Sequence, residues 1–199
     1  MPAPSHLVGH SLFNAPLACI FHRLMRDHAA GKRLHGMVLK SATPRRGEVT
    51  PLWFPGLLEE IEDGALPCVR YRGTATREQR TALRGALNSG QDRKDQAVEA
   101  LRSIQISVLT SVSRGALNHT PGRTQAPLGH EDWVMRVFDC IETTDAGQGD
   151  SMLDGACSRP ISISASPPEM DSEHYYETVL TVECVTFPYF RGDRGCTLQ

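Results

Sequence analysis

The chain has no close pair of cysteines, no long apolar run and no large excess of charge of one sign. Its six cysteines are scattered without a C-x-x-C pair, and close ligand pairs are the usual mark of a structural zinc site. No window approaches the roughly 20 apolar residues that cross a bilayer. The first residues, Met1 to His6, lack the basic and apolar regions of a signal peptide. We therefore expect a protein that is made and kept in a cytosol, where cysteines are mostly small core residues.

Charge and composition also limit the classes of protein that fit. The chain carries 21 basic and 23 acidic residues and a formal net charge of −2, so no global charge attracts DNA or an anionic membrane. Aromatic residues make up only 6% and apolar residues 40% of the chain. Either the surface is large with long loops, or neighbouring subunits complete part of the core. With 199 residues and no internal repeat, we predict a single domain over residues 1–199.

The charges are distributed unevenly along the chain. Acidic residues concentrate in the second half, between Asp139 and Glu183, whereas basic residues cluster in the first half. This asymmetry suits head-to-tail contacts between copies, although solvated faces of helices and hairpins explain any single cluster equally well. The basic clusters are Lys32/Arg33, Arg45/Arg46, Arg70/Arg72 and Arg77/Arg80.

Two segments have the apolar spacing of amphipathic helices. Residues Pro16–Ala30 follow a good N-cap, Asn14, and end before Gly31, which can close the helix. The second segment is an apolar stripe from Trp133 to Ile141, preceded by acidic residues where a helix dipole favours them. Both patterns predict helices that bury one face.

Strand patterns fill much of the remaining sequence. We predict short strands at Met37–Ser41, Val49–Phe54 and Pro67–Arg72, a further strand that begins at Ile161 and Ile163, and a long strand within Tyr175–Phe190. In the long strand Tyr176, Leu180, Val182 and Cys184 fall on one face, and Glu177, Thr181 and Glu183 on the other. The last two strands are predicted to pair antiparallel through the Ser166–Ser172 connection.

The middle of the chain contains both helix-like and strand-like spacing of apolar residues. Thr76 to Gln79 has the form of a capping box, which predicts a helix to Asn88. Asp92–Arg102 continues in helical style, and the alternation in Ile104–Val112 predicts a strand. Gly115–Gly129 and Thr143–Ser158 are expected to be long loops. The expected fold class is α+β, a small antiparallel or mixed β-sheet flanked by two to three helices, with long loops.

No group of residues makes a convincing catalytic, cofactor or metal site. His6 and His10 are four residues apart but lie near Pro4 and Gly9, and His22 and His28 are six apart, which does not place both on one helix face. Cys140 belongs to the second apolar helix, so inert burial is favoured over a nucleophile.

Three loop motifs are equally unspecific. Asp145 to Asp150 only loosely resembles a calcium loop, because the final glutamate is absent. Arg191-Gly192-Asp193 reads best as a turn, and Trp53 with Phe54 as a core plug rather than a contact for a neighbour. We therefore assign no catalytic, cofactor or metal residue and expect a protein that is not an enzyme.

The C-terminal third resembles a known family. The run from Glu173 to Cys184, which ends in Phe187-Pro-Tyr-Phe-Arg-Gly-Asp193, looks like the closing strand of tail-terminator and other neck or tail-completion proteins of tailed bacteriophages. Trp133–Thr144 with the acidic loop after it is similar to the helix before that hairpin. The resemblance covers about Glu131–Arg194 and leaves residues 73–129 as an elaboration.

The resemblance implies a structural virion protein of the viral tail or neck, assembled in the host cytoplasm. Members are α/β subunits of homo-oligomeric, hexameric rings that end the tail tube and join it to the head. The implied partners are sister copies, tail tube or sheath, and head–tail connector proteins, with no membrane and with DNA passing nearby without specific binding. Cys196, near the end of the chain, would be the cysteine to cross-link in an oxidising medium.

Other readings stay open from the sequence. Within the structural class, the chain could be another phage connector or a baseplate subunit. From other classes, it could be a small cytosolic enzyme with cysteine or histidine chemistry, or a monomeric module that binds a ligand or nucleic acid. Such a module needs a concentrated basic face, and only Arg70, Arg72, Arg77 and Arg80 hint at one.

Overall fold

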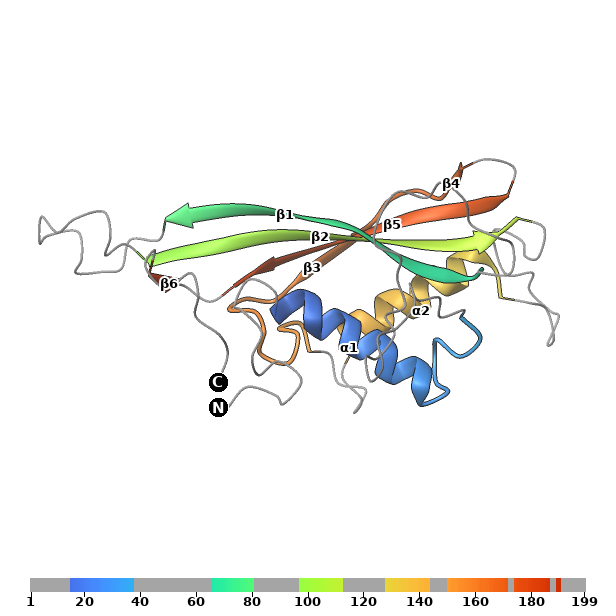
Figure 1. Ribbon diagram of the computed structural model, residues 1–199, viewed down its shortest axis with the longest axis horizontal. Coiled ribbons are helices and arrows are strands. Elements are labelled where there is room, and N and C mark those ends of the chain that lie inside the picture. The colour runs from blue at the N-terminus through green and yellow to red at the C-terminus, as the bar shows by residue number, and fades with distance from the viewer. Residues whose placement is uncertain are drawn as a thin grey trace, which may run out of the picture.

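The computed structural model is an α+β fold in which two helices cover one face of an antiparallel sheet (Figure 1). It describes residues 15–37, 66–80, 97–112, 128–143, 150–171, 174–186 and 189–190. The expected fold class is therefore confirmed. In chain order the elements are α1 (Ala15–Ala29), β1 (Cys68–Arg80), β2 (Ala97–Ser111), α2 (His130–Glu142), β3 (Ser162–Ala165), β4 (Glu169–Asp171), β5 (Tyr175–Val185) and β6 (Tyr189–Phe190).

Helix α1 matches the helix expected at Pro16–Ala30. It places Pro16 in its first turn, where a missing N–H does no harm. Gly31 ends it with a φ of +64°, a left-handed conformation in which glycine has no Cβ penalty. The N–H of Gly31 donates to the carbonyl of His28 at 3.0 Å. Ile20 and Leu24 on its inner face are fully buried.

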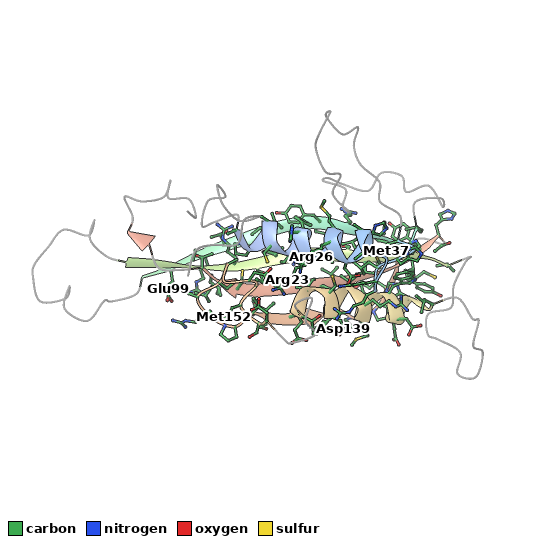
Figure 2. All side chains as sticks on the ribbon, turned by 90° about the horizontal axis from the view of Figure 1, so that it is seen from below. Arg23, Arg26, Met37, Glu99, Asp139 and Met152 are labelled. Atoms are coloured by element: carbon green, nitrogen blue, oxygen red, sulfur yellow. The ribbon has the colours of Figure 1, made fainter. Side chains whose placement is uncertain are left out.

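The sheet has the order β1-β2-β5-β3, and each neighbouring pair is antiparallel. The short strand β4 extends the β3 side of β5, and β6 pairs with the start of β2. In both figures the left ends of β1 and β2 reach past the end of α1, so this part of the hairpin projects beyond the helical layer (Figures 1 and 2). Residues 73–129, which we expect to be an elaboration, contain β2, one of the two inner strands, and most of β1.

The helices predicted in this middle segment are wrong where the structure describes them. Thr76 to Arg80, the start of the helix predicted to Asn88, continue β1, and Ala97 to Arg102 belong to β2. The strand alternation begins earlier than predicted, because buried Ala100 and Arg102 occupy the same face as Ile104. Pairing of Thr76 with Arg102, and so on along the hairpin, satisfies the backbone through the ladder, and this outweighs a local capping signal.

The predicted C-terminal hairpin is confirmed. Ile163 on β3 pairs with Val182 on β5 in an antiparallel register. As expected, Leu180, Val182 and Cys184 are buried against the helices, whereas Glu183 on the other face is exposed. The connection through Pro167 and Pro168 contains one strand that was not predicted, β4.

Helix α2 confirms the predicted stripe and completes the core. The carboxylate of Asp132 accepts the N–H of Gly129 at 2.9 Å and so caps the helix start. Val137 and Ile141 are fully buried in a cluster that joins α1, α2 and the inner face of the sheet. Phe21 of α1 meets Tyr71 of β1 edge to face, with ring centroids 5.9 Å apart.

A smaller apolar cluster lies on the opposite face of the sheet. It contains Leu66, Cys68 and Leu109, with Tyr175 packed against it. Further along this face, Gln105 and Glu183 are exposed. The sheet thus has an inner face under the helices and an outer face that becomes polar toward the projecting hairpin.

Candidate functional site

The most polar feature of the core is an ion-pair cluster around Arg23 of α1. Its guanidinium Nη2 donates to Asp150 Oδ2 at 2.7 Å and to Asp154 Oδ1 at 2.9 Å, and the residue is 2% exposed. A third bond runs from Nη1 to the carbonyl of Ile141 at 2.6 Å. In Figure 2, Arg23 lies between the two helices, with Met152 beyond it. Arg23 therefore ties α1 to the end of α2 and to the loop that follows.

That loop has an unusual backbone. Leu153, Asp154 and Gly155 have φ angles of 50°, 54° and 83°, in the left-handed region that residues other than glycine rarely adopt. The carboxylate of Asp150 accepts the N–H groups of Met152 at 3.0 Å and Asp154 at 2.6 Å. Buried Leu153 and the Arg23 ion pairs supply the contacts that hold this conformation.

The ion pairs fix the protonation state of Asp154. Burial alone would raise its pKa, but hydrogen bonds from Arg23 and from the Cys19 thiol, which donates at 3.2 Å, lower it to about 2. The carboxylate is ionised near neutral pH and its oxygens are engaged. The arrangement therefore suits a structural clamp better than a general base, which must be free to take a proton.

The described cysteines lie in the core, as expected. Burial, with the charge of Asp27, raises the pKa of Cys140 to about 12, and burial beside Asp154 raises that of Cys19. The thiol of Cys157 donates a hydrogen bond to Cys184; this contact and burial raise the pKa of Cys157, and the same contact lowers the pKa of Cys184. Protonated thiols are poor nucleophiles, which fits the inert role predicted for Cys140.

A second buried polar group joins α2 to the sheet. The ring nitrogens of His130 lie 2.9 Å from Thr110 Oγ1 and 2.8 Å from Thr178 Oγ1. Burial lowers the pKa of His130 to about 4, so the imidazole is neutral, donating to one hydroxyl and accepting from the other. The two threonines come from adjacent strands, β2 and β5. His130 thus fixes where α2 begins relative to them.

The arginines of β1 do not make one open basic face. Arg70 is buried, and the guanidinium Nη1 of Arg72 lies 3.4 Å from Glu177 Oε1 on β5. Arg77, on the projecting part of the hairpin, is exposed. The side chain of Arg80 lies outside the described residues. This distribution weakens the reading of β1 as a nucleic-acid surface, which needs several cations on one open face.

The remaining sequence motifs are placed only in part. Asp150, the last residue of the loose calcium-loop motif, pairs with Arg23, whereas residues 144–149 lie outside the described residues. His28 Nε2 lies 3.0 Å from the carbonyl of Met37, which leaves this nitrogen as a donor. The following predictions also lie outside the described residues: His6, His10, Asn14, all of the strand at Met37–Ser41 except Met37, the strand at Val49–Phe54 with Trp53 and Phe54, Arg191–Asp193, and Cys196.

Within the described ranges, no three His, Cys, Asp or Glu side chains are grouped so that they could hold a metal ion. In the same part of the chain, no helix has the length and apolar character needed to cross a bilayer. A comparison with models of known protein families and with curated proteins finds no match for this chain.

Sequence reasoning missed both buried polar groups. Arg23 interrupts the apolar face of α1 between Ile20 and Leu24, and a cation on a buried face signals a buried partner. The partner acids stand more than 120 residues away, so the sequence does not identify them. His130 is the first residue of α2, directly before the acidic residues Glu131 and Asp132, and nothing in the local pattern marks it as buried.

Proposed function

We propose that this protein is a structural subunit of a homo-oligomeric ring that closes the tail tube of a tailed bacteriophage and joins it to the neck. The observation that carries the proposal is the sheet: helices cover one face, and the β1–β2 hairpin extends beyond them (Figure 1). A ring subunit needs a rigid core and an arm that reaches the next copy, and it needs no active site.

The polar core supports rigidity. Arg23 fastens α1 to the loop after α2, and His130 fastens α2 to β2 and β5. Together they cross-link both helices and the sheet with bonds that have specific geometry. Such groups hold the helices and the sheet in one arrangement, which a rigid ring subunit requires.

The surface chemistry is compatible with this role. The formal net charge of −2 gives no strong attraction to DNA that moves through the ring. The outer face is polar near the hairpin, with exposed Gln105, Glu183 and Arg77, which suits contacts that form from a soluble subunit. The resemblance of β5 and α2 to the tail-terminator pattern points to the same class.

The experiment is assembly on tail tubes that lack this protein, viewed by negative-stain electron microscopy. The proposal predicts a ring of added density at one tube end. A protein that stays monomeric and leaves the tube ends unchanged would refute it. Binding at the opposite, host-facing end would instead indicate a baseplate subunit.

A further inference from the structure

The two edges of the sheet are exposed strands that run in opposite directions. β1 and β3 are the ends of the strand order, and no strand within the described ranges pairs with the outer side of either. On β1 the residues Arg72, Ala75, Thr76 and Arg77 are exposed. On β3 the residues Ser162, Ser164 and Ala165 are exposed. The backbone N–H and C=O groups along such edges are ready to pair with another strand.

The strand directions fit a head-to-tail repeat. Because β1, β2, β5 and β3 alternate in direction, β3 is antiparallel to β1. A second copy moved sideways in the plane of the sheet therefore brings its β1 antiparallel to the β3 of the first copy. The helices of both copies then lie on the same side, and the antiparallel ladder continues across the junction.

The register fits as well. Ala75, Ser103, Glu183 and Ser162 are successive partners in one row across the four strands. Ser103 and Glu183 alternate with the buried residues beside them, so the whole row lies on the outer face. In the repeated sheet, Ala75 of the next copy follows Ser162 in this row. Both side chains are small and exposed, so the two backbones can approach.

Charge favours this pairing over a two-fold contact of β1 with itself. Arg77 is exposed on β1, whereas Arg72 already pairs with Glu177 of its own chain. Beside the β3 edge, Glu183 is exposed, and the exposed Arg159 already pairs with Glu99. In head-to-tail pairing Arg77 therefore approaches an edge whose nearby cation is already compensated and whose acid, Glu183, is exposed. Antiparallel pairing of β1 with a second β1 would bring arginines toward arginines, and like charges on facing strands are destabilising.

We infer that the outer edge of β1 pairs with β3 of a second copy of this chain, so that one antiparallel sheet runs through neighbouring subunits. This inference rests on the proposed ring and names its subunit contact. Pro167 and Pro168 follow β3 and limit the shared ladder to its four residues, Ser162–Ala165. A heterologous contact of this kind closes into a ring when the rotation that relates neighbouring subunits is a whole fraction of a full turn.

Cysteine cross-linking tests the contact. Ala75→Cys and Ser162→Cys are made separately in a Cys196→Ser background, in which the five described native cysteines are buried. Cβ atoms of facing residues in adjacent strands are close enough for a disulfide. The inference predicts a disulfide-linked dimer, reversed by dithiothreitol, when the two variants are mixed and oxidised, and no such dimer from either variant alone. The double variant Ala75→Cys/Ser162→Cys should give a ladder of linked species.

Controls separate this contact from other outcomes. Met135→Cys is exposed on α2, away from either edge, and should give no dimer with Ser162→Cys. Ser164 lies two residues after Ser162, on the same face of β3. A dimer between Ser164→Cys and Ala75→Cys would show that the same two edges pair, in a register shifted by two residues. Dimers from Ala75→Cys alone would overturn the inference in favour of two-fold pairing. Mass photometry of the same samples reports assembly independently of the disulfide. Rings that form without any cross-link between the edges would overturn the inference and leave the proposed function standing. Monomers would overturn both.

Discussion

Arg23 Nη2 and Asp154 Oδ1 lie 2.9 Å apart, although 131 residues separate them in the sequence. The side chain of Arg23 is 1% exposed and that of Asp154 is 19% exposed. The pair therefore sits in a medium that screens charge much less than water does. Its loss would leave Asp154 and Asp150 without their cation and release the left-handed turn at Leu153.

Replacing Arg23 by methionine should lower the free energy of unfolding by about 3–5 kcal/mol, because it leaves uncompensated acids beside the core. Urea denaturation followed by circular dichroism measures the loss. Arg159→Met is the matched control: Arg159 pairs with Glu99 at 3.0 Å, but its side chain is 61% exposed. An exposed pair contributes about 0–1 kcal/mol. If the two substitutions lowered the free energy of unfolding equally, the result would contradict a structural role for the ion pairs of Arg23.

Stability should fall in two stages as the pH is lowered. His130 has a folded pKa of about 4 against an ordinary value of 6.5, so the unfolded chain takes up the proton first. Neutral His130 therefore makes its full contribution to stability above about pH 6.5. As the pH falls from 6.5 to 4 this contribution is lost, and the free energy of unfolding decreases by about 3 kcal/mol. Asp154, with a folded pKa of about 2 against 3.8, adds a loss of about 2 kcal/mol between pH 4 and 2.

Urea midpoints measured from pH 7.5 to 4 test the first stage. The variant His130→Asn keeps a polar side chain without the titration and should flatten the profile between pH 6.5 and 4. If the variant retains the full slope of the parent chain, His130 is not the group responsible. The sign is fixed by the direction of the shift: a base whose pKa is depressed by folding always destabilises the fold as acid is added.

Native thiols should react slowly with Ellman's reagent. The five described cysteines are buried, and the pKa values of Cys19, Cys140 and Cys157 are raised. In a Cys196→Ser chain we expect little reaction before unfolding and five thiols after addition of guanidinium. Rapid modification of one thiol in the folded chain would indicate an accessible, activated cysteine and would favour the alternative hypothesis of a cysteine-dependent enzyme.

Reversing the charge of Arg77 should weaken self-association. This exposed residue lies on the projecting part of β1, near the edge that we assign to the neighbouring copy. Arg77→Glu would approach exposed Glu183 beside β3, and we expect a shift toward monomers in sedimentation velocity, larger at low salt. Glu142→Lys, an exposed reversal at the end of α2, is the control and should leave the distribution unchanged.

The sequence predicted the elements whose pattern is local. The stripe of α2, the apolar face of α1 and the alternation of β5 each show the period of their own structure, so all three were found. Thr76 to Gln79 misled because a capping box describes only local bonding, whereas the ladder with β2 is formed by residues distant in the chain. Arg102 further hid the start of β2, because a charged residue in an inward row breaks the apparent alternation.

The polar groups of the core could not be predicted for a related reason. The ligands of Arg23 and the threonines around His130 come from other elements, and their approach depends on the complete topology. Which strands form the edges of the sheet also cannot be predicted from local patterns, because the strand order depends on pairing between distant segments.

The most direct test of the account is the mass of the assembled protein. Mass photometry at micromolar concentration, alone and with tail tubes added, should detect a closed homo-oligomer that is a fixed multiple of the 21.9 kDa chain, six by the family resemblance. A single species at the mass of one chain under both conditions would contradict the account.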